Sequence, residues 1–134
     1  APRIVLDVRP GDNLTVPGLE DRLGQVLRNI IANAESFSPP KGTIRVAARR
    51  RDTVVQIEID DQGPGIPDDK LEAIFDRFYS ERPSGEKFGT HSGLGLSISR
   101  QIVGAHGGTI VAENLRDKAG KVTGARFTIR LPVE

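Results

Sequence analysis

The sequence predicts an α+β domain, with about three helices on one face of a mostly antiparallel sheet. Two long segments, 19–37 and 93–106, repeat apolar residues at helical spacing. Short runs of strand-forming residues lie between and after them, and those at 43–50 and 53–60 are joined by a tight turn. Helices and strands thus alternate along the chain while the later strands form hairpins, which indicates the α+β class.

The chain opens with a strand over 3–8, where apolar and polar residues alternate, and a turn at 10–13 leads into a short strand at 14–16, as in a small hairpin. The segment 19–37 predicts the longest helix, and the Pro-Pro-Lys-Gly sequence that follows Ser38 ends it. The apolar residues of this helix recur at i, i+4, i+7 and i+8, and they are Leu19, Leu23, Val26, Leu27, Ile30, Ile31, Ala34 and Phe37.

The remaining elements follow in order. After the strands over 43–50 and 53–60, a loop rich in Gly and Pro spans 61–69, and residues 70–78 predict a short helix. The segment 81–92 is polar, glycine-rich and without periodicity, which predicts a loop of a length that is usually functional or disordered.

The helix over 93–106 comes next and ends at Gly107 and Gly108. Strands over 109–113 and 126–132, joined by a polar connection, complete the sheet.

The composition predicts one domain and excludes several kinds of site. The chain has 134 residues, about the length of a single domain. It has no Cys and two His, which excludes thiolate metal sites and leaves little for zinc. Lys and Arg number 19 against 18 Asp and Glu, and there is one Tyr and no Trp, so we expect no nucleic-acid partner.

No apolar run approaches the ~20 residues of a membrane span, so we expect no direct membrane insertion. The chain starts in strand-like sequence without an initiator Met, so we expect it to be a fragment of a larger protein.

Asn29 and Asn33 lie one turn apart on the long helix, at the border of its apolar stripe. Two carboxamides at such a margin can reach phosphate oxygens or a hydrated cation in a neighbouring cleft. Asn is a poor helix former, which favours a use for the pair. Taken alone, however, two exposed or capping asparagines would give the same pattern.

Asp61 begins the sequence Asp-Gln-Gly-Pro-Gly-Ile, directly after the strand over 53–60. Alternation along that strand places Asp61 on the apolar face and Asp60 toward solvent. A buried carboxylate is costly unless it accepts hydrogen bonds, and an adenine amino group is a fitting donor. The glycines after it would let a flat ring approach the backbone. A solvated turn carboxylate is the alternative interpretation.

The sequence Ser-Gly-Leu-Gly-Leu, which begins at Ser92, places small residues directly before a helix. Backbone N–H groups at the positive end of a helix dipole bind anions, although an ordinary glycine-rich helix start looks the same. The Gly-Lys pair at 120–121 is not followed by Ser or Thr, which excludes a Walker loop. A Rossmann fingerprint is excluded because the Gly-Leu-Gly sequence lacks the third glycine and does not follow a strand.

In this order, the motifs resemble those of the GHKL family of ATP-binding domains, and within it the catalytic domains of sensor histidine kinases. The resemblance covers almost the whole chain and implies the Bergerat fold, a two-layer sandwich with a mixed, mostly antiparallel sheet of five strands. The sequence around Arg82-Pro83 and in the helix from Ser92 resembles that of the ChvG/ExoS type of alphaproteobacterial envelope sensors. The matching segments are an N box at 27–34, a G1 box at 61–66, an F box at 74–79 and a G2 box at 92–96.

The resemblance implies ATP and Mg²⁺ as the bound cofactors. Asn33 would hold Mg²⁺, with Asn29 assisting through water or phosphate. Asp61 would bind the adenine amino group, and Gly65 would give the ring room. The other nucleotide-binding residues that it implies are apolar walls, backbone donors and their neighbours, namely Ser36, Phe37, Gly63, Ile66, His91, Ser92, Gly93, Leu94, Gly95 and Leu96.

Residues 81–92 would form a lid over the nucleotide, anchored by Phe75 and Phe78, although core packing is an alternative role for at least one of these rings. Arg82, Lys87 or His91 could touch the γ-phosphate. The expected catalytic residues are therefore Asn29, Asn33, Arg82 and Lys87. Two positions depart from the family pattern, because Ser36 stands where a Lys is common and His91 where the first glycine of the G2 box is usual.

Asn29 separates functions within the family. Gyrase-type and chaperone ATPases and anti-sigma-factor kinases carry a Glu at this position as a general base, whereas an Asn cannot accept a proton at neutral pH. The resemblance therefore implies transfer of the γ-phosphoryl group to an imidazole, a reaction in which positioning and electrostatics dominate. A nucleotide-binding regulatory module without catalysis, or a hydrolytic ATPase, remain as alternatives.

The phosphoacceptor histidine is expected outside this chain, because His106 lies at a helix end and His91 has no acidic neighbour. The implied partners are ATP, the helical dimerisation domain that carries the phosphoacceptor, and a response regulator downstream. We expect the isolated domain to be monomeric, and to be the cytoplasmic part of a bacterial inner-membrane sensor.

Overall fold

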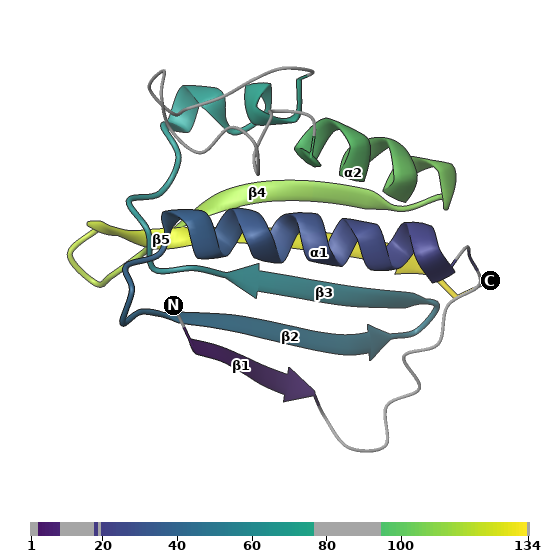
Figure 1. Ribbon diagram of the computed structural model, residues 1–134, viewed down its shortest axis with the longest axis horizontal. Coiled ribbons are helices and arrows are strands. Elements are labelled where there is room, and N and C mark those ends of the chain that lie inside the picture. Colours follow the sequence, from purple (N-terminus) through teal and green to yellow (C-terminus); the bar gives the residue numbers. More distant parts are fainter. Residues whose placement is uncertain (1–2, 9–17, 19, 77–94, 134) are drawn as a thin grey trace.

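The computed structural model describes residues 3–8, 18, 20–76 and 95–133. They form a five-stranded sheet in the order β1-β2-β3-β5-β4, with the two α-helices side by side on one face (Figure 1). The predicted two-layer α+β sandwich is confirmed, with fewer α-helices than expected. The elements are β1 (Arg3–Val8), α1 (Glu20–Phe37), β2 (Thr43–Arg51), β3 (Val54–Asp60), α2 (Gly95–Ala105), β4 (Thr109–Arg116) and β5 (Val122–Pro132).

One pair of strands is parallel and the others are antiparallel. β1 pairs with β2 in parallel, with Ile4 opposite Ile44. The other three pairs, β2 with β3, β3 with β5 and β5 with β4, are antiparallel. Parallel neighbours need a crossover connection, and α1 lies in the connection between β1 and β2. The second strand of the expected N-terminal hairpin, at 14–16, lies outside the described residues.

The core lies between the helices and the sheet. α1 buries Val26, Ile30 and Ala34 at four-residue intervals, as the apolar stripe predicts. The other members of the core come from every strand except β1, and from α2 and the segment before it, namely Ile44, Ile59, Ile74, Phe75, Val103, Ile110, Phe127, Ile129 and Leu131. Neither of the described α-helices is long and apolar enough to cross a lipid bilayer.

The last turn of α2 is closed by two glycines. Gly107 has a φ of +77°, and its N–H donates to Gly104 O at 2.9 Å. Gly108 N–H donates to Val103 O at 2.9 Å, which completes a Schellman motif. A Cβ at Gly108 would lie 2.2 Å from Arg130 O, so this glycine also allows the helix end to approach β5. The predicted helix stop is confirmed.

The short helix expected over 70–78 is instead two 3-10 turns, η1 (Asp68–Lys70) and η2 (Ala73–Phe75). Each turn closes through a bond between residues three apart, as in Phe75 N–H to Glu72 O at 3.1 Å. Asp76 is extended, with φ −71° and ψ 148°, so the segment is too short to propagate an α-helix. Burial of Ile74 and Phe75 produces the helix-like apolar spacing.

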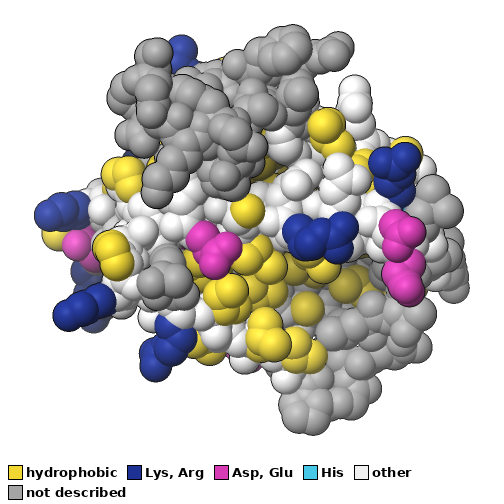
Figure 2. Space-filling model, viewed as in Figure 1, with side chains coloured by type: hydrophobic (Ala, Val, Ile, Leu, Met, Phe, Trp, Pro, Cys, Tyr) yellow, Lys and Arg dark blue, Asp and Glu magenta, His cyan; other side chains and the backbone are white. Residues whose placement is uncertain are grey.

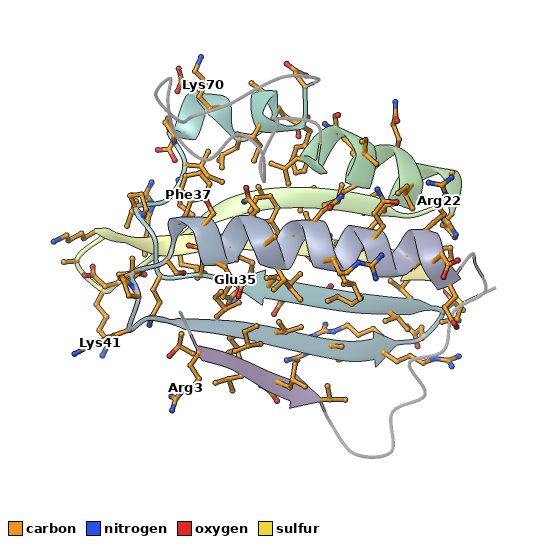
Figure 3. All side chains as sticks on the ribbon, viewed as in Figure 1. Arg3, Arg22, Glu35, Phe37, Lys41 and Lys70 are labelled. Atoms are coloured by element: carbon orange, nitrogen blue, oxygen red, sulfur yellow. The ribbon has the colours of Figure 1, made fainter. Side chains whose placement is uncertain are left out.

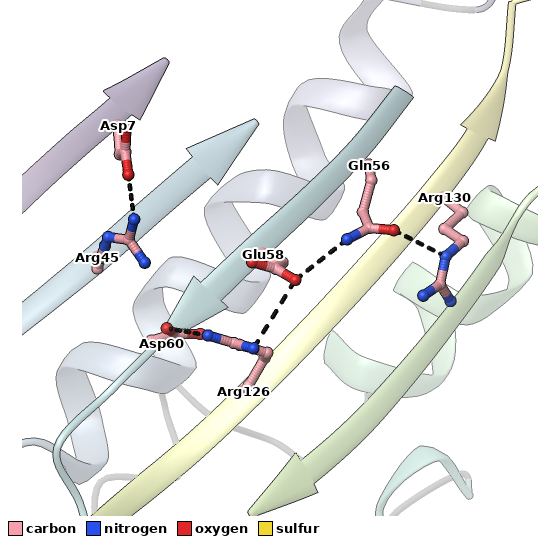
Figure 4. A network of polar contacts seen from close by, with 7 residues as sticks. All are labelled: Asp7, Arg45, Gln56, Glu58, Asp60, Arg126 and Arg130. Atoms are coloured by element: carbon pink, nitrogen blue, oxygen red, sulfur yellow. Dashed lines mark hydrogen bonds and ion pairs between the residues drawn. The ribbon is translucent and has the colours of Figure 1, made fainter. Parts of the chain in front are cut away.

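The face of the sheet opposite the helices carries a charged network (Figure 4). Arg126 donates from Nε and Nη2 to the two carboxylate oxygens of Asp60 at 2.8 and 2.9 Å, and its Nη1 lies 3.8 Å from Glu58. These bonds to Asp60 raise the pKa of Arg126. The Asp60 side chain was expected to point to solvent, but it is only 14% exposed because the guanidinium covers it.

β1 exposes apolar side chains at the edge of the sheet. Ile4, Leu6 and Val8 are 44%, 72% and 48% exposed. Figure 2 shows apolar side chains gathered between α1 and β1 on the helix-bearing face. The α-helices therefore cover the sheet unevenly, and β1 makes the smallest contribution to the core.

Candidate nucleotide-binding site

Asp61 is a buried carboxylate at the point where β3 ends. Asp61 is 4% exposed. Oδ1 accepts hydrogen bonds from the backbone N–H groups of Gly63 at 2.9 Å and Ala125 at 3.1 Å, and Asp61 N–H donates to Ala125 O at 2.9 Å. The strand alternation that placed Asp61 on the core-facing side is therefore confirmed.

The two oxygens of this carboxylate have different surroundings. Burial raises the pKa of Asp61, and the nearby Asp60 carboxylate adds to the rise, while the two backbone hydrogen bonds oppose it. Both of those bonds end at Oδ1, and Oδ2 accepts no hydrogen bond from any residue that the structure describes. Among the described residues, one oxygen is thus held by two backbone N–H groups, and the other has no donor.

Glycines let three backbone segments meet around Asp61. A Cβ at Gly63 would lie 2.7 Å from Phe37 O, at the end of α1. A Cβ at Gly124 would lie 1.9 Å from Asp61 O, in the first part of β5. Since neither distance allows a side chain, the close approach of α1, β3 and β5 requires glycine at both positions. Gly124 belongs to the site although sequence reasoning did not include it.

Gly65 has a conformational reason to be glycine. Its φ is +82°, and an added Cβ would lie 2.4 Å from Val122 Cγ1 and 2.6 Å from Asn114 Oδ1. These contacts come from the strand side of the loop and need no ligand. Room for a flat ring at Gly65 remains a prediction.

The loop over 61–68 is tied to its neighbours by side chains. Gln62 N–H donates to Ser38 Oγ at 3.1 Å, and Gln62 Oε1 accepts from Thr43 N–H at 2.7 Å. On the other side, Asn114 of β4 bonds to both the N–H and the C=O of Ile66, each at 2.7 Å. Asn114 was not predicted as a site residue. The available signal was its type, because Asn is depleted in strands.

Asn29 faces the start of α2. Its Nδ2 donates to Gly95 O and to Ser99 Oγ, both at 3.4 Å, and Ser99 is fully buried. A Cβ at Gly95 would lie 3.7 Å from Asn29 Cγ, so the N box and the G2 box meet at this point. Asn33 is half-buried one turn further along α1, and its side chain has no hydrogen bond with other described residues.

The remaining predicted residues of α1 and α2 lie around the same region. The Ser36 hydroxyl is buried without a hydrogen-bond partner among the described residues. Figure 3 shows Phe37 and Glu35 on opposite sides of the last turn of α1, with Phe37 toward the η1 side of the molecule. Ile66 and Leu96 are partly buried and pack against the core. Their roles as walls for an adenine ring remain predictions.

Phe75 is a core residue. Its ring meets that of Phe127 edge to face, with centroids 6.1 Å apart, and the Arg100 guanidinium lies 5.0 Å above its centroid. Arg100 also pairs with Glu72 at 3.0 Å, which joins α2 to the segment of η1 and η2. The predicted lid and its neighbours lie outside the described residues, namely Phe78, Arg82, Lys87, His91, Ser92, Gly93 and Leu94.

The residues on α1 fit a hydrated magnesium ion better than a metal bound by protein alone. No group of three or more His, Cys, Asp or Glu in the described ranges is arranged to hold a metal. Mg²⁺ retains waters and uses few protein ligands when phosphate oxygens are present. The Asn33 amide, which has no partner among the described residues, offers one such ligand. The nitrogen of the Asn29 amide points to α2, which leaves its oxygen for a second.

Comparison with known proteins identifies relatives along most of the chain. The family described as histidine kinase-, DNA gyrase B-, and HSP90-like ATPase matches residues 18–134. Sensor protein ChvG of Rhizobium meliloti (strain 1021) is 49% identical over 126 residues, which make up 92% of this chain and 22% of that protein. The chain therefore spans about a fifth of the length of this relative.

Solved structures share the fold. The mycobacterial sensor histidine kinase MprB superposes with a TM-score of 0.82 at 34% identity, over 97% of this chain and 80% of that one. Full-length ShkA, solved in complex with AMPPNP, gives a TM-score of 0.78 at 27% identity, over 97% of this chain and 25% of that one. The resemblance to the ChvG type and to histidine kinase domains, inferred from the motifs, is confirmed.

Proposed function

The chain belongs to the family of histidine kinase-, DNA gyrase B- and HSP90-like ATPases, and we propose that it binds Mg·ATP and transfers the γ-phosphoryl group to a histidine on the dimerisation domain of a parent sensor kinase. The observation that carries the proposal is the unequal hydrogen bonding of the two carboxylate oxygens of Asp61. Two backbone N–H groups hold Oδ1, and Oδ2 has no hydrogen bond with the described residues. A free oxygen on a carboxylate that is otherwise buried suits an amino group such as that of adenine.

The adenine end of ATP would lie between the loop over 61–68 and the helices. Its amino group would donate to Asp61 Oδ2. Ile66, Phe37 and Leu96 would form the apolar walls, in keeping with their partial burial. The phosphates would lie toward the start of α2, where the backbone N–H groups of Gly93, Leu94 and Gly95 and the hydroxyl of Ser92 are the expected donors.

Asn33, with Asn29, would hold Mg²⁺ against the phosphates through amide oxygens. When bound, the ion would neutralise charge on the phosphate oxygens. Arg82 and Lys87 are the proposed cationic contacts of the γ-phosphate. The fit of the α1 residues is supported by the half-buried amide of Asn33, which no other described side chain or backbone group engages.

The choice of phosphoryl transfer over hydrolysis rests on Asn29. Its amide donates to Gly95 O and Ser99 Oγ. An amide has no proton-accepting capacity at neutral pH, so this residue would not activate water. An imidazole nucleophile needs no such base, which favours a histidine supplied by the dimerisation domain, with a response regulator as the next acceptor. We further propose a bacterial inner-membrane sensor as the parent, with this domain on the cytoplasmic side.

The test is phosphorylation in trans. The domain is mixed with the dimerisation domain of the parent kinase and ATP labelled at the γ-phosphate, and acid-labile label on the histidine is measured. We expect label that depends on both components and on Mg²⁺. Nucleotide binding without label would instead support a regulatory module, for which the missing cation at Ser36 is the supporting observation. Rapid hydrolysis by the domain alone would support an ATPase.

Calorimetric titration tests the binding residues separately. We expect Asn33→Ala and Asp61→Ala each to weaken Mg·ATP binding by about tenfold or more, since each removes a polar contact to the ligand. Glu35→Ala is the matched control, because Glu35 is exposed and lies on the other side of the same helix turn as Phe37 (Figure 3). Affinities equal to that of the control would exclude the proposed roles.

A further inference from the structure

The end of β4 grips the 61–68 loop through one side chain. Asn114 Oδ1 accepts the N–H of Ile66 at 2.7 Å, and Asn114 Nδ2 donates to the C=O of the same residue at 2.7 Å. The amide therefore pairs with the backbone of Ile66 as a neighbouring strand would. Its Nδ2 also donates to Asp68 Oδ1 at 3.0 Å, which extends the contact to the start of η1.

Arg116 reinforces this contact from the same strand. Its Nη2 donates to both carboxylate oxygens of Asp68, at 3.2 and 3.1 Å. Its Nη1 donates to Gly120 O at 2.9 Å, so the guanidinium joins the β4–β5 connection to the loop. The Arg116 and Asp68 side chains are 43% and 72% exposed, which limits the strength of this ion pair. Asn114 is half-buried, and its paired bonds are the main attachment.

The amide is chemically suited to this position. Only a carboxamide offers one acceptor and one donor side by side, to match the N–H and C=O of a single residue. Asp could accept but not donate, and a hydroxyl cannot span both groups. Asn weakens a strand, so its presence within β4 is better explained by this contact than by the strand.

The contact lies on the strand side of the segment that would bind the base. Asn114 Oδ1 is 2.6 Å from where a Gly65 Cβ would be, so the amide lies against Gly65 and binds Ile66 from the β4 side of the loop. Asp61 holds the other end of the same loop, through its bonds to Gly63 and Ala125. The distance between the Asp61 carboxylate and the Ile66 backbone is thus set from two strands, β5 through Ala125 and β4 through Asn114.

We infer that Asn114 is a positioning residue for the nucleotide base: it holds Gly65 and Ile66 at the separation from Asp61 that adenine requires, and so sets affinity and selectivity for adenine without contacting the nucleotide. The inference rests on the proposed function. It concerns the base alone, so the phosphate end of the site, at Asn33 and the start of α2, is independent of it.

The test compares Asn114→Ala and Asn114→Asp with wild type by calorimetry, using Mg·ATP, Mg·GTP and Mg·tripolyphosphate as ligands. The second variant keeps the size of the side chain and one acceptor but loses the donor, and it serves if the alanine variant folds poorly. Asp117→Ala is the matched control. Asp117 Oδ1 accepts from Ala119 N–H at 2.9 Å and Lys121 N–H at 3.0 Å in the same β4–β5 connection, without contacting the loop.

We expect both Asn114 variants to lose about tenfold or more in affinity for ATP, with the ATP-to-GTP ratio narrowed by a similar factor and tripolyphosphate affinity within about twofold of wild type. Asp117→Ala should leave all three affinities within about twofold. Equal losses for ATP and tripolyphosphate, or ATP binding as tight as in the control, would overturn the inference and leave the proposed function standing. Failure of the wild-type domain to bind ATP would overturn the proposed function and this inference with it.

Discussion

At the scale of single residues, Asp61 combines a structural role with the binding role proposed for it. Oδ1 fastens the loop to β5 through Ala125 and closes the turn at Gly63. An Asn at this position could keep both bonds through its own Oδ1, because an amide oxygen accepts as a carboxylate oxygen does. It would lose the negative charge and the second acceptor, which separates the two roles.

We therefore expect Asp61→Asn to bind Mg·ATP about 10- to 100-fold more weakly, since a hydrogen bond to a charged group is lost. Its free energy of unfolding at pH 7 should stay equal to that of wild type or rise by about 1 kcal/mol, because no charge is buried. Burial raises the pKa of Asp61, so the folded chain binds the proton more tightly than the unfolded chain. Wild type should then lose stability relative to the variant as pH rises from the ordinary Asp pKa through the raised value, and the difference should be constant above it.

Urea denaturation of both proteins from pH 3 to pH 8, and titration with Mg·ATP at pH 7, measure these quantities. A variant that is clearly less stable than wild type at neutral pH, or that binds ATP equally well, would contradict the assignment.

Gly65 and Gly120 separate backbone strain from steric overlap. Both have positive φ, at +82° and +86°, but an added Cβ meets Val122 and Asn114 at Gly65 and nothing within 4 Å at Gly120. We expect Gly120→Ala to cost about 1–2 kcal/mol for the left-handed backbone, and Gly65→Ala at least about 1 kcal/mol more. Chemical denaturation of the two variants checks the difference. Equal costs would show that the loop moves away from β4 freely.

The residues of the site could be predicted only where a local pattern reveals them. Strand alternation located Asp61, and helical spacing located the asparagine pair on α1. Asn114 and Ile66 lie 48 positions apart in the sequence, so nothing local connects them. Gly124 owes its place to the backbone of Asp61 on the neighbouring strand, which is also a contact between distant segments.

At the scale of elements, α2 has a well-bonded C-terminal cap but contains a destabilising glycine in its last turn. The Schellman motif at Gly107 and Gly108 satisfies its last carbonyls. Gly104 lies within the last turn, is exposed, and has open space where a Cβ would be. Glycine in a helix loses more conformational entropy on folding than alanine does.

Gly104→Ala should therefore raise the free energy of unfolding by about 0.5–1 kcal/mol. The midpoint of thermal or urea unfolding measures the gain. ATP affinity is the control. It should not change, because Gly104 lies at the far end of α2 from Asn29. A lower midpoint would mean that the position contacts something outside the described residues.

Element types could be predicted from periodicity, but the 70–78 segment shows the limit. Its apolar residues have helical spacing, yet Asp76 takes an extended conformation and the segment stays in 3-10 turns. Phe75 packs there against Phe127 and Arg100, which are distant in sequence and which no local pattern could reveal. The parallel pairing of β1 with β2 was not predicted, because α1 separates the two strands in the sequence. The second strand of the expected hairpin lies outside the described residues.

At the scale of the whole molecule, the sheet is most secure at its centre. β3 and β5 each pair on both sides, and Ile59, Phe127 and Ile129 are nearly fully buried. Within the described residues β1 pairs only with β2, and its apolar side chains are largely exposed. Local opening requires the least disruption where few buried contacts are lost.

Hydrogen exchange should follow this gradient. We expect the slowest backbone amides in the middle of β3 and β5, with exchange close to the rate of global unfolding, and the fastest strand amides in β1. Exchange followed by NMR, residue by residue, measures the order. Protection of β1 equal to that of β3 would mean that another segment covers it.

The β4–β5 connection has a practical consequence. Lys118 is exposed near its tip, and the connection is joined to the 61–68 loop by Arg116, which contacts both Gly120 O and Asp68. The chain contains no cysteine. Lys118→Cys would thus give a single thiol for an environment-sensitive dye, placed to report in real time, by fluorescence, when the neighbouring loop changes its environment.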